Sequence, residues 1–129
     1  MRIALDTSAY IALQRGHEQL AYSVRAADTV GLPIIVLGEL WFGFLNGTRL
    51  SENSATLDRF LAVDRVSVLN VTAQTARLFG EIATLLRRQG NPIQQDDMWI
   101  AALCKEHGYI LATADRGYRH VLGLQLLEL

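Results

Sequence analysis

Four acidic side chains follow predicted strands or begin predicted helices: Asp6, Glu39, Asp97 and Asp115. In a sheet of parallel strands, functional sites lie outside the carboxyl ends of the strands. Helix N-termini carry partial positive charge, which also favours anions. Carboxylates gathered at such an edge repel one another or are partly neutralised. A divalent cation removes the repulsion, and oxygen-only ligands select Mg²⁺ or Mn²⁺.

Each of these acids also has a purely structural interpretation. Asp6 and Asp115 have the sequence context of caps, and Asp96 with Asp97 could serve as cap and first-turn charge of one helix. Glu39 could pair with an arginine. Because Asp is among the commonest capping residues, capping is the better explanation for any one acid taken alone. The convergence of four acids on one edge favours a metal site.

The elements that position these acids alternate along the chain. Short apolar runs, typical of buried strands, are separated by segments with capping residues or helical periodicity. The predicted strands are residues 2–5, 32–36, 66–71, 109–113 and 124–129, and the predicted helices are residues 6–16, 18–28, 38–47, 51–64, 72–90 and 96–108, with a helical turn over 114–121. This alternation predicts an α/β fold, a three-layer αβα sandwich around a mainly parallel sheet.

Composition limits the class of protein. A chain of 129 residues, half of them hydrophobic, fits one domain spanning residues 1–129. No stretch approaches the ~20 apolar residues of a membrane span, and Asp6 interrupts the early apolar stretch that a signal peptide would need, so we expect a cytoplasmic protein without a membrane partner. The only cysteine, Cys104, lies in an apolar run and is predicted to be buried. The three histidines lack the spacing of zinc ligands.

Four stretches of the sequence resemble the PIN-domain nucleases, and within them the VapC-type toxins of bacterial toxin–antitoxin modules. They are ALDTSAYIAL, IIVLGELWFG, NPIQQDDMWIAAL and ILATADRGYRHVLGLQLLEL, and they contain Asp6, Glu39, Asp97 and Asp115 at the acid positions. Each motif is weak alone, but the four in this order resemble the family over nearly the whole chain. Two residues depart from the family pattern: Asp96 stands where many relatives have Asn, and Tyr118 where Phe is frequent.

The resemblance implies a PIN-like fold and a metal-dependent endoribonuclease. Carboxylate-bound Mg²⁺ or Mn²⁺ would activate water to hydrolyse phosphodiester bonds in RNA. Asp6 and Asp97 are assigned as direct ligands, with Glu39 and Asp115 binding through water or supporting a second ion. Supporting contacts are assigned to Thr7, Thr113 and Asp96, whereas ordinary capping is the favoured role of Ser8.

The resemblance also implies three partners: an RNA substrate, a cognate antitoxin that inhibits the enzyme, and a second copy of the chain in a homodimer. Single-stranded loops, such as those of tRNA, are the expected substrate because their bases can be splayed out and read. The candidate phosphate contacts are Arg116, Arg119, Arg87 and Arg88. A merely solvated surface is the favoured explanation for at least half of these arginines.

Two rival interpretations remain. A phosphoacceptor receiver domain has similar length and clustered acids, but it needs an acidic pair after the first strand and a lysine after the last, and neither is present. A catalytically idle PIN-fold binding module would act through protein contacts, for example through the apolar cluster Leu40–Leu45. Retention of all four acids argues against an idle site.

Overall fold

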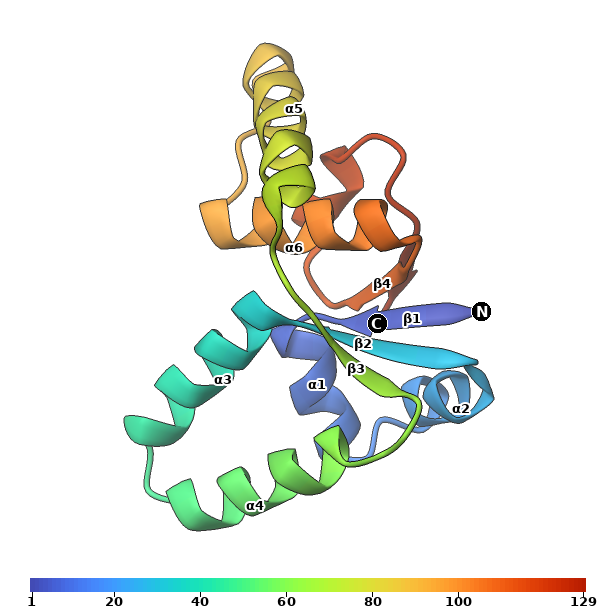
Figure 1. The fold of residues 1–129 in the computed structure, drawn as a ribbon, viewed down its shortest axis with the longest axis vertical. Helices are drawn as coiled ribbons and strands as arrows, with labels where there is room; N and C mark the ends of the chain where they lie inside the picture. The colour runs from blue at the N-terminus through green and yellow to red at the C-terminus, as the bar shows by residue number, and fades with distance from the viewer.

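Five parallel strands form the central sheet (Figure 1). The computed structural model describes all of residues 1–129. The strands are β1 (Arg2–Leu5), β2 (Thr29–Pro33), β3 (Val66–Leu69), β4 (Ile110–Thr113) and β5 (Leu126–Glu128). Their order in the sheet is β3-β2-β1-β4-β5, and all four neighbouring pairs are parallel. The prediction of a mainly parallel sheet is confirmed, and this order differs from the 2-1-3-4-5 order of receiver-like folds.

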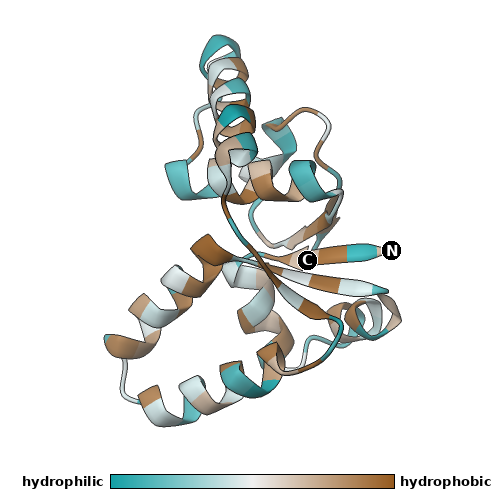
Figure 2. Ribbon diagram, viewed as in Figure 1, coloured by the Kyte–Doolittle hydropathy of each residue, from teal (hydrophilic) through white to brown (hydrophobic).

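Helices cover both faces of this sheet, which makes three layers (Figure 1). Below the sheet in that view lie α1 (Thr7–Gln14), α2 (Glu18–Ala26), α3 (Ile34–Leu45) and α4 (Leu50–Leu61). Above it lie α5 (Ala73–Gln89), α6 (Gln95–His107) and the short 3₁₀ helix η1 (Arg116–His120). Strands covered on both sides are rich in apolar residues. Figure 2 shows hydrophobic stretches within the strands, a hydrophilic end of β1 beside the N-terminus and hydrophilic residues at the tip of α5.

The second strand is displaced from its prediction, which was wrong for residues 34–36. Strand β2 ends at Pro33, and Ile34 already belongs to α3. The β-branched run suggested a strand, but Val36 and Leu40 are the buried residues of α3, and a separation of four is the spacing of a helix face. Pro33 precedes the first helical residue, where its missing N–H costs nothing.

Gly31 explains why the true strand β2 begins earlier than the apolar run. A Cβ at this position would lie 2.9 Å from Leu69 Cδ1 and 2.9 Å from Tyr109 Cε2. The strand therefore needs glycine at this position, because side chains from β3 and from the residue before β4 occupy the space above it. As a result, α3 starts earlier than expected and Glu39 lies in its second turn rather than at its start.

Helix α6 is anchored deep in the core. Its residues Ile100–Cys104 are all buried, so the prediction of a buried Cys104 is confirmed. The ring of Trp99 stacks on Phe79 of α5 at a centroid distance of 4.2 Å, which joins the two helices on this face. Anchoring of this kind fixes the first turn of α6, where Asp96 and Asp97 lie. No helix in the chain combines the length and apolar character that crossing a membrane requires.

Candidate active site

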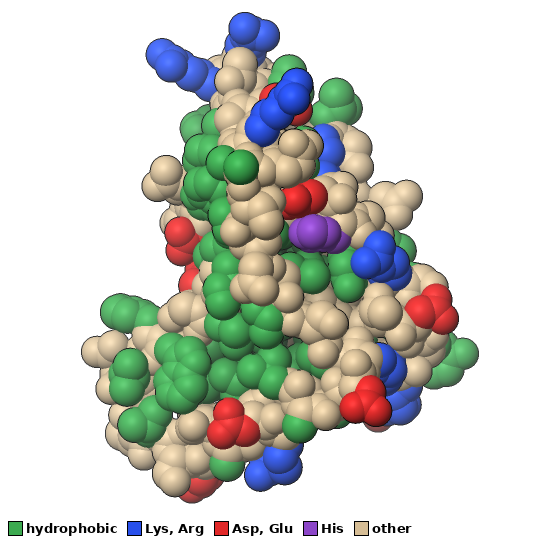
Figure 3. All heavy atoms as spheres, in the orientation of Figure 1, with side chains coloured by type: hydrophobic (Ala, Val, Ile, Leu, Met, Phe, Trp, Pro, Cys, Tyr) green, Lys and Arg blue, Asp and Glu red, His purple; other side chains and the backbone are tan.

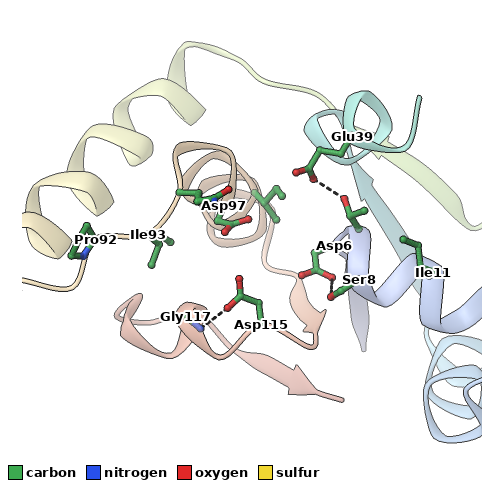
Figure 4. Close-up of a pocket in the computed structure, with 12 residues that line it drawn as sticks. Asp6, Ser8, Ile11, Glu39, Pro92, Ile93, Asp97, Asp115 and Gly117 are labelled. Atoms are coloured by element: carbon green, nitrogen blue, oxygen red, sulfur yellow. Dashed lines mark hydrogen bonds between the residues drawn. The ribbon is translucent and has the colours of Figure 1, made fainter. Parts of the chain in front are cut away.

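A cavity of about 830 Å³ opens at the carboxyl edge of the sheet, and all four predicted acids line it (Figure 4). The chain runs from β1 outward to β2 and β3, then crosses back to β4 on the other side of β1. The point where strand order reverses is the usual ligand site of an open parallel sheet. Asp6, Glu39, Asp97 and Asp115 are contributed by four segments far apart in sequence.

Asp6 directly follows β1 and is 5% exposed. One carboxylate oxygen, Oδ1, accepts hydrogen bonds from the Ala9 N–H at 2.8 Å and from the Ser8 hydroxyl at 2.6 Å. The other oxygen, Oδ2, accepts from the Thr113 hydroxyl. Asp6 therefore caps α1, as the structural interpretation proposed, and at the same time presents its carboxylate at the cavity (Figure 4).

Two hydroxyl side chains connect Asp6 to the end of β4. Ser8 Oγ accepts from the Ala114 N–H at 3.0 Å, and Thr113 Oγ1 accepts from the Asp115 N–H at 2.9 Å. Each hydroxyl thus donates to Asp6 and accepts from the segment that leads to Asp115. Ser8 is more than the ordinary cap that the sequence favoured, because it joins residues 106 positions apart.

Glu39 is tied to α1 rather than to an arginine. Its Oε1 accepts from the Thr7 hydroxyl at 2.6 Å, a contact between α3 and α1 that Figure 4 draws as a dashed line. The side chain is partly buried. Thr7 is one of the residues assigned to supporting contacts from the sequence, and this is the contact it makes.

Asp115 caps η1, and its carboxylate Oδ1 accepts from the Gly117 N–H at 2.8 Å. A Cβ on Gly117 would lie 3.1 Å from that same oxygen and 3.6 Å from Ile93 Cγ2. The loop residue Ile93 also lines the cavity. Gly117 therefore allows the carboxylate of Asp115 and the loop before α6 to approach each other closely.

Asp97 lies in the first turn of α6, and its Oδ1 accepts from the Tyr118 hydroxyl at 2.9 Å. Burial raises the pKa of Asp97, the Tyr118 hydrogen bond opposes that rise, and the negative charges of the other three acids add to it. Burial also raises the pKa of Tyr118, as does the neighbouring Asp97, so the phenol stays protonated as a donor. Sequence reasoning missed this contact; the only signal was a tyrosine where relatives often have Phe.

No cationic side chain offsets the charge of this cluster. The ion pairs of the chain involve other acids, and none includes Asp6, Glu39, Asp97 or Asp115. An oxygen-only set without a counter-charge fits Mg²⁺ or Mn²⁺. No three of the acids are grouped tightly enough to hold one ion together, so at most two carboxylates could bind a Mg²⁺ directly and waters would complete its shell.

The remaining predicted site residues do not line the cavity. Asp96 is exposed beside Glu39 in a smaller hollow that also contains Phe42, and it does not line the acidic cavity. Arg116 is exposed next to Asp115, whereas the Arg119 Nε donates to Glu128 Oε2 at 2.6 Å. The pair Arg87 and Arg88 occupies the last turn of α5, at the end that projects away from the sheet (Figure 1).

Comparison with known proteins places the chain in a family. The model of the PIN domain matches residues 3–124. Ribonuclease VapC2 of Haemophilus influenzae is 28% identical over 97% of this chain and 96% of that protein. The tRNA(fMet)-specific endonuclease VapC of Shigella flexneri is 33% identical, covering 70% of this chain and 68% of that protein.

A solved structure shows the same fold. The crystal structure of VapBC2 from Rickettsia felis, bound to a DNA fragment from their promoter, contains a chain that superposes with a TM-score of 0.88. That match covers 99% of this chain and 98% of the other, at 23% identity. The matched relatives are VapC-type proteins. Because the PIN domain model matches residues 3–124, and the fold and the four acids on one edge are consistent with it, the chain belongs to the PIN domain family.

Proposed function

We propose that this protein is a metal-dependent endoribonuclease, the VapC-type toxin of a toxin–antitoxin pair. The observation that carries the proposal is the set of four carboxylates from four segments lining one cavity without a cationic partner. Membership of the PIN family and the ribonuclease relatives support the same chemistry. We also propose that residues 1–129 form one domain, which contains this site.

A bound Mg²⁺ or Mn²⁺ would supply positive charge for the scissile phosphate and lower the pKa of a water at the site. In this proposal Asp6 and Asp97 hold the ion directly, while Glu39 and Asp115 act through water. The hydroxyl of Thr113 keeps the Asp6 carboxylate turned towards the cavity. These contacts exist before substrate arrives, so little reorganisation is needed when charge develops at the phosphate.

RNA is the proposed substrate, cut in a single-stranded loop. The cavity is open to solvent, and the unpaired bases of a single strand can be splayed out to enter it. One relative is specific for tRNA(fMet), which makes tRNA loops the first substrates to test. Exposed Arg116 adjoins Asp115 and is the first candidate phosphate contact; Arg87, Arg88 and Arg119 are candidates for phosphates farther from the cut.

An antitoxin is the proposed protein partner. A groove between α1, α3 and α4 shares Thr7, Ile11 and Glu39 with the acidic cavity and continues along Leu40 and Phe44. A segment lying in this groove would reach the acids and block them. On α3, Phe42 and Leu45 are 72% and 65% exposed, and Figure 3 shows hydrophobic atoms gathered over this part of the surface. Apolar surface of this kind marks a protein contact.

A homodimer is proposed from the family resemblance and is tested separately. Size-exclusion chromatography with light scattering at high micromolar concentration should give twice the mass of the chain. A mass of one chain at that concentration would remove the dimer from the proposal and leave the nuclease unaffected.

The nuclease itself is tested by cleavage of a small-RNA pool with purified protein. The reactions contain Mg²⁺, Mn²⁺ or a chelator, and compare the wild-type chain with Asp97→Asn. A matched control is Asp64→Asn, because Asp64 is an exposed acid that does not line the cavity. We expect discrete products with metal, none with chelator or Asp97→Asn, and normal products with Asp64→Asn.

Two outcomes would contradict the proposal. No cleavage by a folded wild-type chain, across total RNA and tRNA loops, would favour the idle binding module. Cleavage that persists in chelator and in Asp97→Asn would exclude the carboxylate site as its source. Sequencing the product ends in the expected case identifies the substrate and the position of the cut.

A further inference from the structure

We infer that Tyr118 is a positioning residue that holds Asp97 in the orientation needed to bind the catalytic cation. The inference rests on the proposed function, because it assumes that Asp97 is a metal ligand. The observation behind it is the hydrogen bond from the Tyr118 hydroxyl to Asp97 Oδ1 at 2.9 Å.

Tyr118 is the only hydrogen-bonding partner of the Asp97 side chain. Asp6 differs, since three donors hold its carboxylate. Without the phenol, Asp97 would be free to turn among its rotamers at the mouth of the cavity. The bond occupies Oδ1 and leaves Oδ2 for a cation. Metal-binding side chains are commonly oriented in this way, by a hydrogen bond from a neighbouring residue.

The burial and position of Tyr118 suit it to this role. Its side chain is 1% exposed and lies within η1, three residues after Asp115. The hydrogen bond therefore joins η1 to the first turn of α6 and fixes the carboxylate of Asp97 relative to that of Asp115. A phenylalanine at this position would fill the same space but could not make the connection.

The variant Tyr118→Phe removes only the hydroxyl, and the chain offers a matched control. Tyr10 is also buried, but its hydroxyl has no hydrogen-bond partner, so Tyr10→Phe deletes the same atom from a buried tyrosine that makes no such bond. Mn²⁺ alone is the probe, and isothermal titration calorimetry gives the dissociation constant for the wild-type chain, both tyrosine variants and Asp97→Asn. Thermal unfolding in chelator monitors the fold of each protein.

We expect Tyr118→Phe to weaken Mn²⁺ binding about tenfold, the lower end of the effect of removing such an orienting partner. Tyr10→Phe should bind like the wild type, and Asp97→Asn should lose more than Tyr118→Phe. In RNA cleavage, the Mn²⁺ concentration for half-maximal rate should rise by a similar factor for Tyr118→Phe. Saturating Mn²⁺ should then restore most of its rate, but should not restore Asp97→Asn.

The outcomes separate this inference from the proposed function. Wild-type affinity in Tyr118→Phe, with loss in Asp97→Asn, would overturn the positioning role and leave the metal site intact. An equal loss in Tyr10→Phe would show a general packing effect and would also overturn it. A wild-type chain that binds no Mn²⁺ would remove both the metal site and the role of Tyr118 within it.

Discussion

The hydroxyl of Thr113 donates a hydrogen bond to a carboxylate oxygen of Asp6, although the two residues lie 107 positions apart in the chain. Both are buried, Thr113 completely. The same hydroxyl accepts from the Asp115 N–H. One small side chain at the end of β4 therefore satisfies a buried charge at the end of β1 and sets the path of the segment that carries a second acid.

Replacing Thr113 by valine should destabilise the metal-free protein by about 1–3 kcal/mol, because Asp6 loses a hydrogen bond to its buried charge and the Asp115 N–H loses its acceptor. Valine keeps the shape of threonine and suits a strand, so the missing hydroxyl is the only large change. Urea unfolding in chelator measures the difference, and RNA cleavage should fall as well.

Thr29→Val is the control for that substitution. The hydroxyl of Thr29, in β2, is buried and has no hydrogen-bond partner. Its removal should leave the free energy of unfolding unchanged or slightly higher. Equal destabilisation by the two valines would show that the effect at position 113 does not come from its contact with Asp6.

The stability of the metal-free protein should depend on Asp97 in a defined direction of pH. Burial and the neighbouring acids raise the pKa of Asp97 in the folded state, so the folded protein holds that proton to a higher pH than the unfolded chain does. The raised pKa of Asp97 therefore stabilises the folded state at low pH, and this stabilisation is lost as pH rises through the pKa of the folded state. Asp97→Asn should raise the melting temperature at neutral pH, because it removes a partly buried charge among like charges.

The gain from Asp97→Asn should shrink as pH falls and disappear by about pH 3, below the ordinary pKa of aspartate, where the carboxyl is protonated in both states. The asparagine oxygen can still accept from Tyr118, so that contact is retained. Thermal unfolding in chelator from about pH 3 to about pH 8 provides the measurement, with Asp64→Asn as the exposed control. A variant less stable than wild type at neutral pH would show that the hydrogen bond from Tyr118 to the ionised carboxylate outweighs burial and the repulsion from the other acids.

Much of this site could be predicted from the sequence because three of its four acids, Asp6, Asp97 and Asp115, stand at recognisable element boundaries. Asp6 and Asp115 follow apolar strands, and parallel pairing brings the ends of β1 and β4 to one edge. The cross-connections could not be predicted in the same way. The sequence predicts only a capping role for Ser8. The hydrogen bond from the Ala114 N–H to its hydroxyl oxygen forms only once the sheet has folded, so no local pattern indicates it.

The error at residues 34–36 has a related cause. Local composition favours a strand at Ile34–Val36. The segment that pairs with β1 is instead the one that contains Gly31, because Leu69 and Tyr109 pack over this residue and leave no room for a side chain. Tertiary packing thus selected a glycine-containing strand and placed the β-branched run in a helix. The expected position of Glu39 at a helix start was therefore wrong, since Glu39 lies in the second turn of α3, although its side chain still lines the cavity.

Gly117→Ala should reduce RNA cleavage with only a small effect on stability. The new Cβ would lie 3.1 Å from Asp115 Oδ1, closer than ordinary contact, so the carboxylate or the Ile93 loop must shift by a few tenths of an ångström. Displacements of this size matter at a metal site, where productive geometry is held within about 0.5 Å. The measurement is the cleavage rate across Mn²⁺ concentrations.

Gly80→Ala is the matched control for Gly117→Ala. Gly80 lies within α5, and a Cβ there would meet no atom within 4 Å. Alanine in a helix interior should stabilise the protein by about 0.5–1 kcal/mol and leave cleavage unchanged. Normal cleavage by Gly117→Ala would show that the site tolerates movement of Asp115, and would argue for a remote role of that acid.

Arg116 and Arg119 should differ in their contribution to RNA binding, although they lie three positions apart. Arg116 makes no ion pair, whereas Arg119 is held by Glu128 at 2.6 Å on the exposed surface. In the Asp97→Asn background, which should bind RNA without cutting it, Arg116→Ala should weaken binding of single-stranded RNA. It should also lower the slope of log affinity against log salt by about 0.7, the value for one phosphate contact on a single strand.

Arg119→Ala should change the slope less, because Glu128 already neutralises that charge. Fluorescence anisotropy over a range of salt gives both slopes, and Arg25→Ala, in the last turn of α2, supplies a control for loss of one exposed positive charge. A larger slope change for Arg119 than for Arg116 would place the RNA path along β5 instead of beside Asp115.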